Sequence, residues 1–273
     1  MAAADTGILE ALRVQIRDVR NEIVELLARM DHITLQELPR IRADFALKIG
    51  CWEQALLEAE IAGRRAKRRL ALAQAQANRG EEPQMAAIDE RLDEELASWM
   101  AKAEQMRIAY EQALSYIAGR APMGKSDAAE LKRLYRTLVK RLHPDVSPAR
   151  GAEVSELFQL AQSAYRNGDV DMLRSLEVAT RHLDPAEDDL EGEDDEAMLE
   201  QELELALIER DVMEGRLHDL EDSEEMRLGR LLASPEWVTE RTMELRGAVE
   251  EWGQVRRECE ERLAQLRRCF NGR

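Results

Sequence analysis

The chain has 273 residues, of which 35% are charged and only 4% are aromatic, and its formal net charge is −17. So little aromatic volume excludes one large core of bulky side chains, and it favours burial of Leu, Ile, Val and Ala along narrow helical seams. The negative charge argues against general binding of nucleic acid or anionic membranes, because phosphate contacts need a basic surface. Three cysteines, no signal peptide and no apolar run of membrane-spanning length predict a cytoplasmic protein.

The first 40 residues carry an unbroken heptad pattern. Apolar side chains recur at alternating spacings of three and four, which predicts one amphipathic helix. These positions are Leu9, Leu12, Ile16, Val19, Ile23, Leu26, Met30 and Ile33. Because proline disfavours a continuing helix, Leu38-Pro39 is expected to break the seam. Residues 1–40 are therefore predicted to form an N-terminal heptad helix.

Two further seams, over residues 45–77 and 92–117, lie on either side of a turn signal. Gly80 tolerates a positive φ angle, and Pro83 suits the first turn of a new helix. Residues 41–118 are therefore predicted to form an antiparallel coiled-coil hairpin, whose arms are about 50 Å long at 1.5 Å per residue. Its second arm is expected to serve as the first helix of the small domain that follows.

Residues 119–126 fit the P-loop expression GxxxxGK[ST] letter for letter. A P-loop needs a strand that delivers its glycines to a helix N-terminus, and a later acidic residue for magnesium. Here a heptad helix precedes the motif and Pro122 lies inside it. We therefore interpret these residues as a turn between helices, with no nucleotide or other cofactor.

Residues 131–145 form the one stretch whose pattern indicates a site. Placed on a helix, its apolar and basic side chains fall on opposite faces. The apolar stripe consists of Leu131, Leu134, Tyr135, Leu138 and Leu142. The basic face consists of Lys132, Arg133, Arg136 and Lys140.

The ends of this helix carry their own signals. Asp127 is expected to cap the first turn, with Glu130 reaching back as in a capping box. Pro144 should end the helix at His143, because the residue before a proline avoids α dihedrals. A second amphipathic segment covers residues 153–165. Two antiparallel helices joined at a His143-Pro144-Asp145 loop are predicted.

This stretch resembles the J domains of DnaJ-like co-chaperones. Residues 130–138 follow the family's second helix in their order of acidic, apolar, basic, tyrosine and leucine positions, and the helix ends at His-Pro-Asp. Phe158 and Ala164-Tyr165 also stand where the family's third helix carries Phe and Ala-Tyr. The resemblance covers residues 125–180. A short helix over residues 170–179 replaces the usual basic fourth helix, and the usual first-helix motif is missing.

The resemblance implies a partner and a set of functional residues. In the family, the His-Pro-Asp loop and the basic face of the second helix engage a DnaK-type heat-shock ATPase and promote its ATP hydrolysis. Carried over residue by residue, the loop is the trigger and the helix is the docking surface. The trigger consists of His143, Pro144 and Asp145, and the docking surface consists of Lys132, Tyr135, Arg136 and Lys140.

Residues 184–196 contain nine acidic side chains and no basic one. Such a run repels itself and predicts a solvated linker over residues 183–197. A sharper hypothesis is that the run folds back onto the basic helix, because residues 131–150 hold six basic side chains and one acidic one, a net +5. Beyond it, seams over residues 199–220 and 238–270 predict a second coiled-coil hairpin in residues 198–273.

The sequence thus predicts an all-α protein, in which long antiparallel helical hairpins (coiled coils) flank a small J-like helical domain over residues 119–182. The predicted function is that of a co-chaperone or adaptor, without catalytic residues, metal or cofactor. Its expected partners are a DnaK-type ATPase and client or coiled-coil proteins, with a possible homo-oligomer through the heptad seams. The alternative is a structural scaffold whose J-like domain has lost its ATPase. His32, His182 and His218 are interpreted as surface or helix-flank residues.

Overall fold

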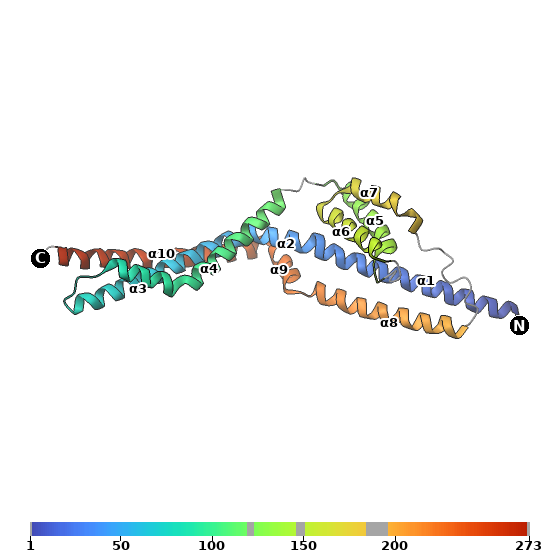
Figure 1. Cartoon of the computed structure of the whole chain (residues 1–273), viewed down its shortest axis with the longest axis horizontal. Helices are drawn as coiled ribbons and strands as arrows, with labels where there is room; N and C mark the ends of the chain where they lie inside the picture. Colours follow the sequence, from blue (N-terminus) through green and yellow to red (C-terminus); the bar gives the residue numbers. More distant parts are fainter. Residues whose placement is uncertain (1, 119–122, 146–150, 184–195, 272–273) are drawn as a thin grey trace. The chain divides into compact units, whose positions relative to one another are not determined.

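The computed structural model describes residues 2–118, 123–145, 151–183 and 196–271. They form helices joined by short connections, and no strand occurs within these ranges (Figure 1). The predicted all-α class is therefore confirmed. The α-helices are α1 (Ala2–His32), α2 (Leu38–Phe45), α3 (Cys51–Asn78), α4 (Met85–Ala118), α5 (Lys125–Leu142), α6 (Gly151–Asn167), α7 (Val170–Ala179), α8 (Glu196–Glu221), α9 (Glu224–Leu232) and α10 (Pro235–Asn271).

The chain divides into two compact units, each built from two separate stretches of sequence. The first unit comprises Met1–Arg40 and Gly119–Arg227, and the second comprises Ile41–Ala118 and Leu228–Arg273. None of the described helices is both long and apolar enough to cross a lipid bilayer.

The predicted helix break at Leu38-Pro39 is wrong. A π-helical turn, η1 (Ile33–Glu37), follows α1 directly and leads into α2 without an interruption. Pro39 directly follows this π turn and Leu38, inside a continuous helix, where its missing N–H removes one backbone hydrogen bond. The π turn shifts the hydrogen bonding by one residue, so that the N–H of Leu38 donates to the carbonyl of Ile33. A second π turn, η2 (Ala46–Gly50), joins α2 to α3 in the same way.

In the first unit, α5, α6 and α7 pack around a core that α1 completes. Four apolar side chains of α1 enter this core beside those of α5, α6 and α7. Its fully buried large side chains include Tyr135, Leu138, Val139, Leu142, Tyr165 and Leu173. The helix predicted to take this place was α4, but α4 belongs to the second unit. An apolar heptad seam does not specify its partner, so the sequence pattern could not separate α1 from α4.

The ends of the small helices follow local rules, with one correction. α5 begins at Lys125 rather than at Asp127, and none of the described side chains caps it. Glu130 does not close a capping box, because its carboxylate accepts two hydrogen bonds from Arg174 of α7, at 2.8 and 2.6 Å. Gly168 ends α6 with a φ of +73°, and Asp169 caps α7 by accepting from the N–H of Met172 at 2.9 Å.

α8 packs along α1 in the first unit, and the two helices run parallel. Ion pairs join Arg20 to Glu202 and, at 3.1 Å, Arg29 to Glu221, so that residue numbers rise together along both helices. A small apolar cluster around Ile16 and Leu199, both 0% exposed, forms the start of this contact.

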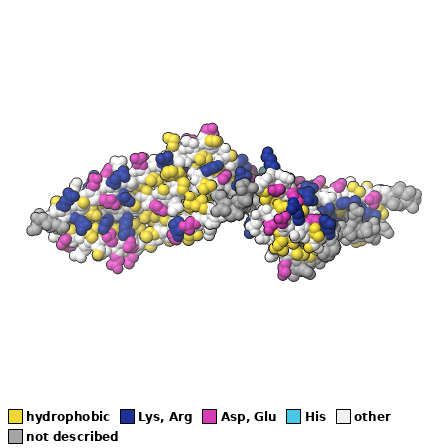
Figure 2. Space-filling model, turned by 90° about the horizontal axis from the view of Figure 1, so that it is seen from above, with side chains coloured by type: hydrophobic (Ala, Val, Ile, Leu, Met, Phe, Trp, Pro, Cys, Tyr) yellow, Lys and Arg dark blue, Asp and Glu magenta, His cyan; other side chains and the backbone are white. Residues whose placement is uncertain are grey.

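The second unit is built on α3. α4 returns along it in the antiparallel direction, with ion pairs Arg65–Asp93 at 2.5 Å and Arg69–Asp89 at 2.7 Å. α10 also packs on α3 but runs parallel, since Glu53 pairs with Arg241 at 3.5 Å, and Gly63 lies against Trp252 further along both helices. On the face that Figure 2 shows, acidic and basic side chains are interspersed over this unit.

The C-terminal helices therefore have partners that differ from the prediction. The sequence predicted that residues 198–273 fold as one antiparallel hairpin, whereas α8 packs on α1 and α10 packs on α3. Both contacts are parallel and join segments that are distant in sequence. The cause is physical: the spacing of apolar residues defines a seam, but flanking charges and side-chain sizes select its partner and its direction.

Candidate protein interaction site

α5 separates its side chains as its sequence predicts, with an apolar face toward α1, α6 and α7 and a charged face toward solvent. Lys132, Arg136 and Lys140 are exposed and stand four residues apart, which puts them on one side of the helix. The buried face consists of Leu131, Leu134, Tyr135, Leu138, Val139, Arg141 and Leu142.

The loop after α5 is held in place by its own first residue. His143 leaves the helix with φ −65° and ψ 130°, the extended conformation that a following proline favours. Its N–H still donates to the carbonyl of Val139 at 3.0 Å, and its ring meets that of Phe158 edge to face at 4.9 Å. The backbone N–H of Asp145 donates to Nδ1 of His143 at 3.1 Å. Pro144 and Asp145 remain exposed.

The electrostatics of His143 follow from this position. Burial lowers the pKa of the imidazole, while the carboxylates of Asp145 and Asp31 raise it, and burial is the largest of these effects. Nδ1 accepts the Asp145 hydrogen bond, so the neutral ring carries its proton on Nε2. The loop therefore presents a neutral imidazole, a rigid proline and one exposed carboxylate.

The N-terminal helix contributes a carboxylate to the basic face of α5. Glu25 of α1 accepts from Nε of Arg136 at 2.8 Å, and both side chains are more than half exposed. An exposed pair of this kind is worth about 0–1 kcal/mol, so it opens at little cost. Arg136 is thus partly neutralised inside the chain, and the heptad pattern of α1 gave no sign of this contact.

Tyr135 is not a surface residue, which corrects its predicted role in docking. The side chain is 1% exposed and stacks on Tyr165 with ring centroids 4.0 Å apart. Its hydroxyl donates to Asp31 of α1 at 2.5 Å. Burial and this carboxylate raise the pKa of Tyr135, so its hydroxyl stays protonated. Tyr135 therefore joins α5 to α1 and α6 and does not face a partner.

Arg141, one of the six basic side chains counted in residues 131–150, is buried. It is 5% exposed, and its Nη1 donates to the backbone carbonyl of Glu177 at 2.8 Å. The Glu177 carboxylate and the Thr180 hydroxyl lie at 3.4 and 3.5 Å. The guanidinium thus joins α5 to the C-terminal end of α7 by hydrogen bonds. The net charge of +5 for residues 131–150 therefore includes one charge that is not on the surface.

His32 lies partly buried at the end of α1, beside Tyr165 of α6, which is compatible with the helix-flank position predicted for it. Its Nδ1 is 2.8 Å from the hydroxyl of Tyr165, and its Nε2 is 3.3 Å from the Glu37 carboxylate. Burial lowers the pKa of His32, and the nearby Lys132 lowers it further. His218 is 77% exposed, as predicted for a surface histidine.

Three sequence predictions fall wholly or partly outside the described residues. The acidic run 184–196, whose fold-back onto the basic helix was one hypothesis, is described only from Glu196 onward. Residues 119–122 of the P-loop-like stretch are outside the described set. The last residues of that stretch, Lys125 and Ser126, form the first turn of α5. The side chain of His182 is also outside the described set.

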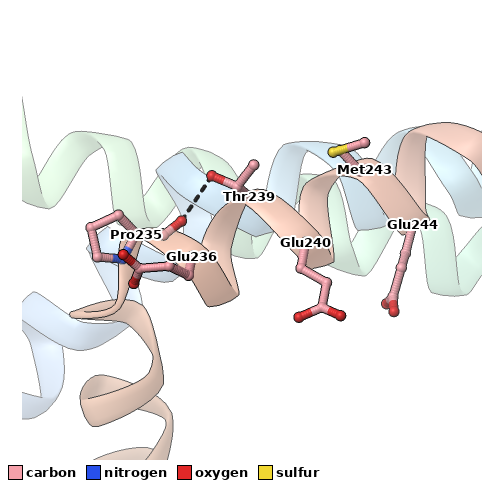
Figure 3. A pocket seen from close by; sticks show the side chains of 6 residues that line it. All are labelled: Pro235, Glu236, Thr239, Glu240, Met243 and Glu244. Carbon is pink, nitrogen blue, oxygen red and sulfur yellow. Dashed lines mark hydrogen bonds between the residues drawn. The ribbon is translucent and has the colours of Figure 1, made fainter.

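A shallow depression on α10 has no features of a catalytic site. All the residues that line it come from the surface of this one helix, so no second wall brings groups together above them (Figure 3). Its one drawn hydrogen bond, from the Thr239 hydroxyl to the Pro235 carbonyl at 2.8 Å, lies within the helix. The charged face of α5 and the loop that ends it remain the candidate interaction site.

Comparison with protein-family models, with curated proteins and with solved structures gives no match to this chain.

Proposed function

We propose that this chain is a J-domain co-chaperone or adaptor, which engages a DnaK-type heat-shock ATPase through the His143-Pro144-Asp145 loop and the basic face of α5. In this proposal α5, α6 and α7 are the J-like domain, and the long helices are coiled-coil arms that flank it and bind clients or partners. The protein acts in the cytoplasm and performs no chemistry of its own.

The observation that carries the proposal is the fixed presentation of the loop. His143 is held by the Val139 carbonyl and by the Phe158 ring, whereas Pro144 and Asp145 are exposed. A partner that binds such a loop does not have to order it first, so less of the binding free energy is lost to conformational entropy.

The charged face of α5 supports the same proposal. Lys132 and Lys140 are exposed on the side of the helix that leads to the loop, with Arg136 between them. Positive charge arranged along one face speeds association with an acidic surface, even where each contact adds little affinity.

Asp145→Asn tests the role of the loop. The substitution keeps the shape of the side chain but removes its charge, and we expect ATPase stimulation to fall to the unstimulated rate. The assay is single-turnover ATP hydrolysis by a purified DnaK-type ATPase with the full-length chain. Asp127→Asn is the matched control, because Asp127 is an exposed carboxylate at the other end of α5. Equal stimulation by the Asp145→Asn variant, with unchanged circular dichroism, would refute the proposal.

Arg136→Ala tests electrostatic docking. We expect ATPase binding to weaken by up to about fivefold at low ionic strength, and the loss to shrink as salt is added. Glu25→Gln is the reciprocal variant, because it releases Arg136 from its ion pair and should strengthen binding under the same conditions. A loss that does not depend on salt would count against docking through this face.

The alternative function is a structural scaffold without ATPase coupling. The Arg136–Glu25 ion pair favours it, because this residue of the basic face is already paired inside the chain and is less available to a partner. The scaffold would be favoured if neither the wild-type chain nor the Glu25→Gln variant bound or stimulated the ATPase.

A further inference from the structure

α8 carries two apolar seams, and among the described residues only one of them packs against another part of the chain. Leu199, Ala206 and Met213, which repeat every seven residues, are 0%, 8% and 5% exposed. Each is preceded by another apolar residue. These are Met198, Leu205 and Val212, which are 54%, 59% and 47% exposed.

The two seams lie on different sides of the helix. Consecutive residues of an α-helix are separated by about 100°, so a side chain next to a buried one points well away from the contact with α1. Ile208, which is 55% exposed, stands three residues after Leu205 and four before Val212. The exposed set therefore has the three-and-four spacing of a seam that packs against another helix. We name Met198, Leu205, Ile208 and Val212 the free seam.

Carboxylates border the free seam on both edges. Glu204 and Asp211 lie along one edge and are exposed, and Glu209 follows the other edge. Between residues 198 and 212 the one basic side chain is Arg210, which already pairs with Asp211 at 2.7 Å and with Glu22 of α1 at 3.4 Å. The border of the free seam thus carries a net negative charge.

This charge pattern selects the occupant. A second copy of α8 would bring carboxylates against carboxylates, because both edges carry the same sign, and like charges beside a helical seam oppose pairing. A helix with apolar residues at the seam and Lys or Arg beside them would instead pair its charges with Glu204, Glu209 and Asp211. We infer that the free seam of α8 binds a basic amphipathic helix of another protein, beyond any ATPase docking at α5.

The probe for this inference is a fluorescently labelled three-heptad peptide with Leu at the a and d positions and Lys at e and g. Fluorescence anisotropy with the full-length chain should show binding that weakens as salt is raised. The variant Leu205→Gln/Ile208→Gln removes two seam side chains without changing the charge. It should weaken binding by at least about tenfold, because two buried apolar contacts are lost.

Two controls separate a seam from simple charge attraction. Met243→Gln alters an equally apolar residue, 68% exposed on α10 in the second unit, and should leave peptide binding unchanged. A peptide that keeps its lysines but has Ser in place of Leu should bind at least about tenfold more weakly.

Three results would overturn the inference. One is no binding of the Leu/Lys peptide to the wild-type chain. Another is equal binding of that peptide to wild type and to the Leu205→Gln/Ile208→Gln variant. The third is a dimer in sedimentation of the wild-type chain that the double variant abolishes, because the free seam would then take a second copy.

Discussion

The α1, α5, α6 and α7 core and the α3, α4 and α10 bundle consist of similar helices but bury different side chains. The core contains Tyr135 stacked on Tyr165, and it satisfies its buried polar groups through partners such as Asp31 and Glu177. Along α3 most of the buried residues are small, namely Gly63, Ala66 and Ala73, with Leu57 as the larger one. The first arrangement concentrates stability in a few interlocked residues, and the second spreads it along the helices.

Aromatic residues show the same contrast. In the bundle, Arg64 of α3 lies over the rings of Trp99 on α4 and Trp252 on α10, at 4.6 and 5.6 Å from their centroids. Each of these three residues comes from a different helix, and all three are at least partly exposed. A cation over an exposed ring contributes about 0.5–1 kcal/mol, less than a fully buried aromatic residue. Such contacts hold the helices side by side without forming a wide core.

The largest loss of stability is expected from a cavity in the core that α1, α5, α6 and α7 form. Leu138→Ala removes a side chain that is 0% exposed and leaves a cavity, which should cost about 2–5 kcal/mol of unfolding free energy. Lys140→Ala, on the exposed side of the same helix, is the control and should change stability little. Hydrogen exchange should rise in α1, α5, α6 and α7 of the Leu138→Ala variant. A rise that spared α1 would contradict its place in this core.

A smaller loss of stability is expected where α3 and α10 make their close contact at Gly63. A Cβ atom at Gly63 would lie 2.5 Å from a ring carbon of Trp252, so Gly63→Ala forces α3 and α10 apart. The overlap should exceed the gain in helix propensity and cost about 1 kcal/mol in net unfolding free energy. Gly247→Ala on α10 is the matched control, because nothing lies within 4 Å of its added carbon. That variant should be stabilised, as measured by urea denaturation. Equal effects at both glycines would contradict the close contact.

The smallest effect is a pH dependence confined to the first unit, which holds all four histidines. Burial lowers the pKa of His32 and His143 in the folded state, so the unfolded chain binds protons first as the pH falls below about 6.5. Stability should therefore decrease between pH 7 and 5.5. His32→Gln/His143→Gln should flatten this slope in urea denaturation, whereas His218→Gln should not. If the unfolding free energy of the double variant still fell with pH as in the wild type, the two histidines would not be its cause.

The sequence predicted local structure better than it predicted partners. The α7 helix, the end of α5 before His143-Pro144-Asp145 and the buried stripe of α5 follow from signals within a few residues. Tyr135 was assigned wrongly to the docking surface, and the burial of Arg141 was not foreseen, because these two side chains contact α1 and α7, which lie far away in sequence. The parallel direction of α8 relative to α1 could not be predicted either, because ion pairs such as Arg20–Glu202 form only once the two helices are packed in register.

The completion of the first core by α1 has a consequence for synthesis on the ribosome. Asp31 and Tyr135, which meet in the folded core, are 104 residues apart. At about 5–20 residues per second, α1 emerges roughly 5–20 s before α5. During that interval the side of α1 that carries Val19, Ile23 and Leu27 has no folded partner, while residues 41–118 of the other unit are being made. A nascent chain stopped before α5 would therefore expose an apolar helix to its neighbours.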